Sequence, residues 1–153
     1  MGADAAVAAQ AAASVELLHN FTLIHDDVMD GDHLRRGRAT VWRVWGVGDA
    51  VLLGDALHAL STRVLIGGPD RVVVRAAALM ASTALDLCAG QHFDCACEHG
   101  GGVEVADYLL MASGKTGALL GAACALLPVA PRDGWSSHRS ATATGCRFQW
   151  GGL

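Results

Sequence analysis

The stretch ELLHNFTLIHDDVMDGDHLRRGRATVW, from Glu16 to Trp42, joins an apolar run to a densely charged one. The apolar run belongs to a longer segment, Ala3 to Met29, which is rich in Ala and Leu and contains no Gly or Pro. Because good helix formers and apolar residues recur there at helical spacing, the segment is predicted to be one long helix. We expect this helix to stop at Gly31-Asp32, and the following RRGRAT segment to be a loop.

Three later segments also have the composition and the stop signals of helices. The sequence GGP at residues 67–69 and the glycines at residues 100–102 separate them. Their predicted bounds are about Asp49–Leu65, Asp70–Glu98 and Val105–Leu127. No stretch alternates in the manner of a strand, so we predict an all-α fold, a partial bundle of about four main helices.

Residues 1–127 are expected to form one domain, and the sequence changes character from Pro128 onward. The last part, PVAPRDGWSSHRSATATGCRFQWGGL, holds two of the four tryptophans, many Ser, Thr, Gly and Arg residues, and no helical period. We expect residues 128–153 to be an irregular tail. It is either disordered or read in a shifted frame, and composition leaves both alternatives open.

The composition favours a buried chain with a small anionic ligand. Hydrophobic residues make up 52% and charged residues 17% of the chain, against roughly 45–50% and 25% in an average globular protein. The net charge of -4 argues against a nucleic-acid surface, which normally shows as a basic patch. The arginines cluster locally instead, as a binding site for a small anion would require.

The cysteines and the apolar runs bear on the compartment. The five cysteines are odd in number, and no signal-peptide pattern is seen, so a reducing cytoplasm is expected. The longest apolar stretch, Ala118 to Ala130, is broken by Gly121 and Pro128 and is shorter than the roughly 20 residues that span a bilayer. We therefore expect no transmembrane segment.

An acidic cluster lies at the end of the first predicted helix. Asp26 and Asp30 are four residues apart and share one face, with Asp27 beside them. These carboxylates repel one another, and the helix dipole adds partial negative charge at the same end. A cation should be bound there. Oxygen ligands suit Mg²⁺, which commonly bridges one or two carboxylates to substrate phosphates.

Basic residues that could hold such phosphates lie nearby and farther along the chain. Arg35 and Arg36 have the side chains that bind phosphate oxygens in bidentate fashion, and Lys115 lies in GKTGALL. A D-D-x-x-D pattern alone is more often a solvated helix end followed by a charged loop. The combination of the acids with the arginine pair and the lysine favours a binding site.

Four stretches, in this order and at these distances, resemble one known family: ELLHNFTLIHDDVMDGDHLRRGRATVW, LLGDALHAL, AGQHFD and YLLMASGKTGALLGAACAL. Over about Ala11 to Leu127 the chain resembles the trans-type isoprenyl diphosphate synthases, also called the polyprenyl synthetase family. The resemblance implies an all-helical bundle in which Mg²⁺ draws diphosphate from an allylic diphosphate. The resulting carbocation is attacked by the double bond of isopentenyl diphosphate, and proton loss gives a chain longer by one isoprene unit.

The resemblance also assigns roles to residues of this sequence. The implied metal-binding and catalytic carboxylates are Asp26, Asp27 and Asp30 of the first aspartate-rich motif, with Asp94 of a Q-x-x-D motif added to the metal set. The implied diphosphate-binding residues are Arg35, Arg36, Gln91, Lys115 and Thr116, of which Lys115 is also counted as catalytic.

Phe21, five residues before Asp26, faces the position where the family sets product length. An aromatic residue there tends to block long chains, so the resemblance implies a short product of farnesyl or geranylgeranyl size. The alternative is that Phe21 belongs only to the core.

Two parts of the family pattern are missing from this sequence. The upstream G-K-x-x-R-P type segment, which supplies basic residues for isopentenyl diphosphate, is not present, and neither is the second aspartate-rich motif. We therefore expect a truncated form with weak or no activity. Helices without their neighbours leave apolar faces open, and the family is typically dimeric, so a homodimer is expected.

Other residues could hold a metal or act as bases. Cys88, His92, Cys95 and His99 recur at helical spacing, yet four ligands on one straight helix cannot surround a zinc ion tetrahedrally. We favour the cysteines as small apolar residues. His19, His25 and His58 are interpreted as hydrogen-bonded core or rim residues, and Asp55 as a structural residue that pairs with a neighbouring helix.

Two further classes of function remain open. The chain could be a non-catalytic helical subunit or remnant that dimerises with a full-length synthase. Terpene cyclases share a D-D-x-x-D motif but lack the following arginine pair, so we rank them lower.

Overall fold

The computed structural model describes residues 2–66, 70–99 and 105–126, and the expected all-α fold is confirmed. The predicted tail, residues 128–153, lies outside the described residues. The elements in chain order are α1 (Gly2–Met29), β1 (Leu34–Arg35), β2 (Arg38–Ala39), α2 (Val41–Trp45), α3 (Val47–Arg63), α4 (Asp70–His99), α5 (Val105–Ala112), the π-helical turn η1 (Ser113–Gly117) and α6 (Ala118–Leu126).

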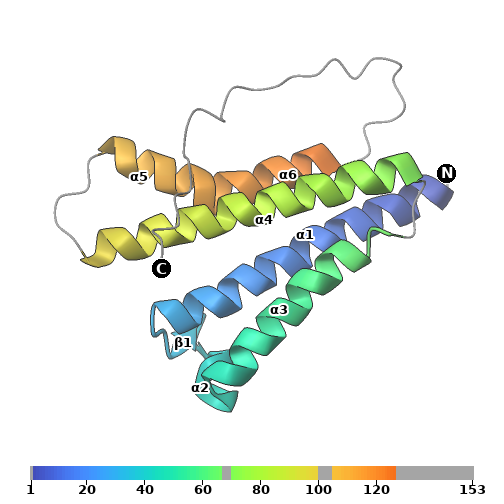
Figure 1. Cartoon of the computed structure of the whole chain (residues 1–153). Helices are drawn as coiled ribbons and strands as arrows, with labels where there is room; N and C mark the ends of the chain where they lie inside the picture. The colour runs from blue at the N-terminus through green and yellow to red at the C-terminus, as the bar shows by residue number, and fades with distance from the viewer. Residues whose placement is uncertain (1, 67–69, 100–104, 127–153) are drawn as a thin grey trace, which may run out of the picture.

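The helices form two groups that meet along α1 (Figure 1). On one side α3 packs along α1, and this is the most extensive helix pair of the described chain. On the other side α4 runs beside α5, η1 and α6, and both α4 and α6 contact α1. Segments from the two ends of the described chain are thereby brought together at α1.

The end of α1 is set by Gly31, as the sequence predicts. Gly31 has a φ of 69°, the left-handed conformation that a glycine adopts without steric cost. The amide of Asp32 donates a 3.0 Å hydrogen bond to the carbonyl of Asp27, the long-range closure of a Schellman-type helix end. The acidic cluster therefore lies on the last turn of α1.

The RRGRAT segment forms a small hairpin, so the prediction of a plain loop was wrong. Strand β1 pairs antiparallel with β2, with Arg35 opposite Arg38. The turn residues Arg36 and Gly37 have φ values of 51° and 77°, the positive values that a type I′ turn needs at both central positions. Strands of two residues are too short to show alternation, and Arg is an uncommon first residue for this turn.

A short helix that the sequence did not predict follows the hairpin. The Thr40 hydroxyl and the Trp42 indole N–H both donate to the carbonyl of Asp32, at 2.7 Å and 2.8 Å. These bonds fasten the start of α2 to the chain segment that follows α1. Gly46, with a φ of 93°, then separates α2 from α3, which begins two residues before the predicted Asp49.

The core lies where α1, the end of α3 and α4 meet. Its buried residues are Leu18, Phe21, Leu65, Met80, Ala84 and Leu87. The α1–α3 contact is close because α3 buries small residues, Ala50, Gly54 and Ser61. A Cβ atom on Gly54 would lie only 2.2 Å from Nε2 of His25, so this crossing depends on a glycine.

One helix, α4, is long and apolar enough over Val73–Cys97 to cross a membrane, judged by length and composition alone. The expectation of no transmembrane segment rested only on the apolar stretch that begins at Ala118, so Val73–Cys97 was overlooked. A single helix of this kind is weak evidence, because core helices pass the same test. This segment carries Asp94, whose carboxylate binds a lysine inside the bundle.

Candidate active site

A cavity of about 710 Å³ lies between α1, α4 and the η1–α6 segment. Most of its wall area is apolar, one end carries Asp26, Gln91 and Lys115, and α1 adds a second acid, Glu16. The lining residues are Val15, Glu16, His19, Phe21, Thr22, Leu23, His25, Asp26, Met29, Leu87, Cys88, Gln91, His92, Cys95, Lys115, Thr116, Leu119, Leu120 and Ala123. A mostly apolar cavity with charged side chains at one end suits a ligand with a hydrocarbon tail and an ionic head group.

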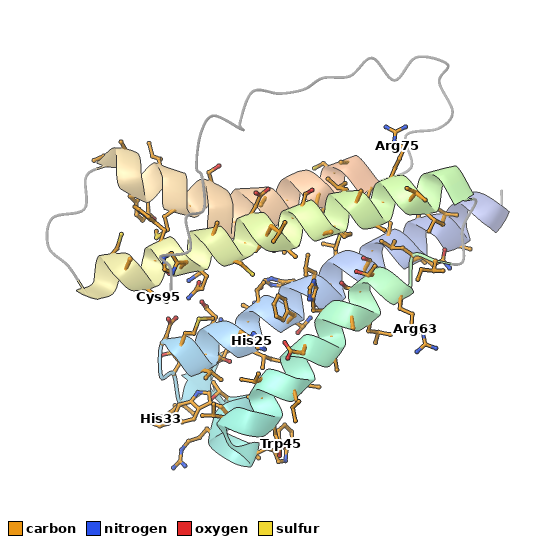
Figure 2. The ribbon with its side chains drawn as sticks, viewed as in Figure 1. His25, His33, Trp45, Arg63, Arg75 and Cys95 are labelled. Atoms are coloured by element: carbon orange, nitrogen blue, oxygen red, sulfur yellow. The ribbon has the colours of Figure 1, made fainter. Side chains whose placement is uncertain are left out.

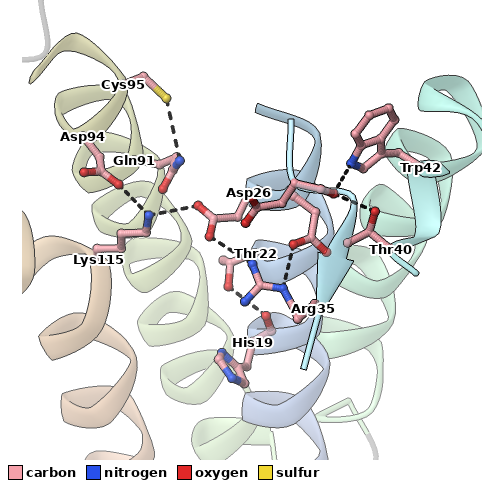
Figure 3. Close-up of polar contacts among 12 residues, drawn as sticks. His19, Thr22, Asp26, Arg35, Thr40, Trp42, Gln91, Asp94, Cys95 and Lys115 are labelled. Carbon is pink, nitrogen blue, oxygen red and sulfur yellow. Dashed lines mark hydrogen bonds and ion pairs between the residues drawn. The ribbon is translucent and has the colours of Figure 1, made fainter. Parts of the chain in front are cut away.

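Lys115, the only lysine of the chain, bridges two helices at the polar end. Its ammonium lies 3.0 Å from Oδ1 of Asp26 on α1 and donates a 2.5 Å hydrogen bond to Oδ2 of Asp94 on α4 (Figure 3). Partial burial alone would lower the pKa of Lys115. The hydrogen bond to Asp94 and the negative charges of Asp26 and Asp94 outweigh that effect and raise this pKa, so the lysine is cationic at neutral pH.

Arg35 neutralises the other side of the acidic cluster. Its Nε donates a 2.6 Å hydrogen bond to Oδ1 of Asp27, a residue only 4% exposed, and its Nη2 lies 3.4 Å from Oδ2 of Asp26. Desolvation lowers the pKa of Arg35, but the bond to Asp27 and the charges of Asp27, Asp26 and Asp32 raise it overall. The hairpin thus turns Arg35 back onto the end of α1.

The same carboxylates have the chemistry of a magnesium site. Within residues 2–66, 70–99 and 105–126, no three Asp, Glu, His or Cys side chains converge on one point. Mg²⁺ does not require such a cage, since it keeps several waters and takes one or two carboxylates. Oδ1 of Asp26 is buried and accepts no hydrogen bond among the described residues, because its ion pair with Lys115 lacks hydrogen-bond geometry. This oxygen, aimed at the polar end of the cavity, fits a cation.

Known proteins share both the sequence and the fold. The family model described as polyprenyl synthetase matches residues 2–149. The chain belongs to the polyprenyl synthetase family. It is 59% identical to a geranylgeranyl diphosphate synthase of Mycobacterium tuberculosis over 126 residues, covering 82% of this chain and 36% of that protein.

Two further relatives agree with this membership. A (2E,6E)-farnesyl diphosphate synthase of Mycobacterium bovis is 44% identical over 135 residues, covering 86% of this chain and 38% of that protein. The crystal structure of a geranylgeranyl pyrophosphate synthetase from Pyrococcus horikoshii superposes with a TM-score of 0.77 at 36% identity, covering 82% of this chain and 39% of the other. The chain therefore spans between 36% and 39% of the length of these relatives.

Most of the residues that the synthetase resemblance singled out are brought together. Asp26, Asp27, Arg35, Asp94 and Lys115 form one connected set of ion pairs. Gln91 and Thr116 line the cavity beside that set. The amide of Gln91 donates to Sγ of Cys95 at 3.7 Å. These seven residues come from α1, the hairpin, α4 and η1.

Two predicted residues, Asp30 and Arg36, lie outside both this set of ion pairs and the cavity wall. Asp30, just after α1, is exposed, although it shares a helix face with Asp26. Arg36 is exposed at the hairpin turn and makes no hydrogen bond or ion pair with the described residues. Adjacent arginines in a tight turn point to opposite sides, so only Arg35 reaches the acids in this structure.

The position of Phe21 fits both of the roles that the sequence left open. It is 8% exposed and belongs to the core cluster, yet it also lines the cavity. Its ring stacks on His58 at 5.0 Å and meets His25 edge-on at 4.7 Å. Packing on two imidazoles from α1 and α3 holds the ring in place.

The other histidines and the cysteines have structural contacts. His25 lies between α1 and α3 (Figure 2), with Nε2 3.1 Å from the carbonyl of Val51 and 3.9 Å from Asp55, as expected for an α1–α3 pair. His19 accepts, through its backbone carbonyl, a 2.8 Å bond from the Thr22 hydroxyl. Burial raises the pKa of the Cys88 thiol, which is unlike a metal-binding thiolate. The side chain of His99 lies outside the described residues.

Sequence reasoning missed the residues that hold the site in place. A Cβ on Gly90 would lie 2.7 Å from the backbone N of Lys115 and 2.9 Å from the backbone C of Gly114. The two glycines let α4 touch η1, and the π-turn, a feature frequent at functional sites, directs Lys115 to Asp26 and Asp94. Isolated glycines inside two predicted helices, each next to a motif, were the available signal.

Proposed function

We propose that the protein is a prenyltransferase that condenses an allylic diphosphate with isopentenyl diphosphate to give a short-chain polyprenyl diphosphate. The observation that carries this proposal is the mostly apolar cavity with Asp26 and Lys115 in its wall, where ion pairs join these two residues to Arg35 and Asp94. The family membership supports the same reaction class. The names of the relatives, geranylgeranyl and farnesyl diphosphate synthases, support the substrate class.

The residues divide the work between the head and the tail of the allylic substrate. Lys115 and Arg35 supply positive charge for the diphosphate, with Gln91, Thr116 and Arg36 as further donors to its oxygens. Asp26 and Asp27, with Asp94 and Asp30 at the edge, would hold Mg²⁺. When bound, Mg²⁺ neutralises charge on the leaving diphosphate.

The apolar wall is needed for the chemistry as well as for affinity. The allylic C–O bond breaks and diphosphate leaves with the electron pair. The double bond of isopentenyl diphosphate then attacks the carbocation, and loss of a proton restores a double bond. Leu87 and Leu119 exclude water that would otherwise capture the cation. Phe21, fixed by its two histidines, limits the space for a long tail.

Dimerisation, a cytoplasmic setting and the absence of a membrane-spanning segment are part of the proposal. Large apolar side chains that are exposed on α2 and α3, including Trp45 and Leu52, support a partner surface. Because this sequence carries one of the family's two aspartate-rich motifs, we propose that these 153 residues alone convert substrate weakly.

Calorimetric titration with a non-hydrolysable allylic diphosphate analogue, with and without Mg²⁺, tests the proposal. We expect binding that requires Mg²⁺ and weakens by about 10-fold to 100-fold in Asp26→Asn, because a charge-assisted contact is worth roughly 1.5–3 kcal/mol. Asp55→Asn is the matched control, since it removes the same charge from a carboxylate that is 63% exposed and absent from the cavity wall. A folded chain that does not bind the analogue would contradict the proposal.

The exposed apolar surface also supports the second candidate, a helical subunit that pairs with a full-length synthase and does no chemistry. Trp45, Leu52 and Leu60 are exposed on α2 and α3, outside the cavity. In that case the chain would co-purify with the synthase and would not bind the analogue by itself. The titration above therefore separates the two candidates.

A further inference from the structure

The polar end of the cavity already contains a cation. Lys115 lies between Asp26 and Asp94, at 3.0 Å and 2.5 Å, and these carboxylates approach from opposite walls, α1 and α4. Without a cation between them they would repel each other, since both side chains are largely shielded from water. The lysine therefore occupies the position that a metal ion bridging the two acids would take.

The lysine is an imperfect occupant of that position. Oδ1 of Asp26 is buried, lies 3.0 Å from the ammonium and still accepts no hydrogen bond among the described residues. Lys115 is bound firmly only to Asp94, where the hydrogen bond is short. The contact with Lys115 neutralises the charge of Asp26 but leaves its Oδ1 without a hydrogen bond. A ligand that satisfies this oxygen better can therefore replace the lysine.

An ammonium and a hydrated Mg²⁺ cannot occupy the same position between Asp26 and Asp94. Metal that binds Asp26 and Asp94 must displace Lys115, whose charge then needs new anionic partners. Diphosphate supplies such partners, because its oxygens can accept the N–H groups of the displaced ammonium. Mg²⁺ frees the ammonium that diphosphate binds, and diphosphate frees the carboxylates that Mg²⁺ binds. Each ligand therefore raises the affinity for the other, because linkage is reciprocal.

Resting on the proposed function, we propose that Lys115 is a built-in competitor of the metal: it closes the Asp26–Asp94 site to Mg²⁺ alone and releases it when diphosphate arrives. The lysine thereby acts as a regulatory element of the site as well as a diphosphate ligand. Metal binding and diphosphate binding are then strongly cooperative, and the site does not fill with metal before substrate is present.

Metal binding without diphosphate provides the first test. Mn²⁺ serves as the probe, because its free ion is counted directly by its EPR signal. Lys115→Met should bind Mn²⁺ at least about 10-fold more tightly than the wild type. This gain corresponds to only a small part of the repulsion between the Lys115 ammonium and a neighbouring Mn²⁺ ion. A variant that binds Mn²⁺ equally or more weakly than the wild type overturns the proposal.

Two variants control this test. Arg63→Met removes one positive charge from the exposed end of α3, where the side chain points away from the bundle (Figure 2), and should leave Mn²⁺ affinity within about 3-fold of the wild type. Lys115→Arg keeps a cation at the site and should not gain the affinity of Lys115→Met. Circular dichroism checks the helix content of each variant.

A second measurement needs no variant. Because Lys115 is the only lysine, lysine labelled with ¹³C at Cε gives one side-chain signal in the wild-type chain. Mg²⁺ with methylenediphosphonate should shift this signal at Mg²⁺ concentrations about 5-fold to 150-fold below those needed for Mg²⁺ alone. Mg²⁺ that binds tightly by itself without moving the lysine signal overturns the proposal.

These results are separable from the fate of the proposed function. If the wild type binds the allylic analogue with Mg²⁺ but Lys115→Met gains no metal affinity, the competitor role is wrong and the prenyltransferase proposal stands. If Lys115→Met gains metal affinity while the analogue never binds, the competitor role stands and the prenyltransferase proposal is wrong.

Discussion

Adjacent residues of the same type can have opposite importance, and Arg35 and Arg36 illustrate this. Arg35 binds the buried Asp27, whereas Arg36 is exposed at the turn. We expect Arg35→Met to lower the free energy of unfolding by about 1–3 kcal/mol, because it leaves a buried carboxylate without its partner. Urea denaturation would measure this change.

The matched control for that prediction is Arg36→Met. It removes the same charge one residue away and should change the free energy of unfolding by no more than about 0.5 kcal/mol. Equal losses in the two variants would mean that net charge, and not the Asp27 contact, determines the stability.

Sequence predicted which residue types belong to the site but not which members of each pair enter it. The acids at the end of α1, the arginine pair and the distant lysine are visible as a pattern. Asp26 and Asp27 enter the site and Asp30 does not, because of where α1 ends. Arg35 enters it and Arg36 does not, because the tight turn has two positive φ values. Gly31 marks the end of α1 in the sequence, but the tight turn at Arg36 and Gly37 is set by backbone geometry that composition does not encode.

At the scale of the elements, the contact between α4 and η1 depends on Gly90. We expect Gly90→Ala to lower the free energy of unfolding by about 1–3 kcal/mol, because its Cβ would lie 2.7 Å from backbone and not from a movable side chain. Thermal and urea denaturation would measure the loss, and binding of the allylic analogue should weaken with it.

Gly121→Ala, in α6, is the corresponding control. Nothing lies within 4 Å of a Cβ at this position. An alanine there should therefore stabilise the protein, by roughly 0.5–1 kcal/mol, through the lower backbone entropy of the unfolded chain. If Gly90→Ala also stabilised the protein, the close α4–η1 contact would be wrong.

The main helices were predictable because glycines and prolines mark their ends, while three local features were not. The hairpin and α2 are too short to show a period, and they are held by side-chain bonds to the carbonyl of Asp32. The π-turn interrupts what the sequence predicted as one helix from 105 to 127. It lies where Gly114 and Lys115 meet Gly90 of α4, and such a tertiary contact leaves no local pattern.

At the scale of the whole molecule, the described chain buries few large apolar side chains for its composition. More than half of the sequence is hydrophobic, at 52%, yet Trp45, Leu52, Val74 and Leu85 are each more than 60% exposed. We expect concentration-dependent self-association, because apolar faces of this extent associate in water. Sedimentation equilibrium should give a mass above the 15.8 kDa of one chain.

Salt provides the discriminating condition for that prediction. Apolar association should persist or strengthen when sulfate is raised, whereas association through ion pairs would weaken. Leu52→Glu, on the outer helix α3, should shift the equilibrium toward the single chain. A monodisperse 15.8 kDa species at all concentrations would contradict the expectation.

The placement of the site across α1 and η1 also determines when it can form during synthesis. Asp26 leaves the ribosome 89 residues before Lys115, and α3 can pack on α1 in that interval because their contacts are closer in sequence. Until residue 115 emerges, Arg35 pairs with Asp27 and Asp26, but the acidic turn lacks its second cation and its Asp26 side remains hydrated and negatively charged. The nascent α1–α3 pair thus bears a charged cap that opposes premature aggregation, and the arrival of the single lysine converts that cap into the inside of a binding site.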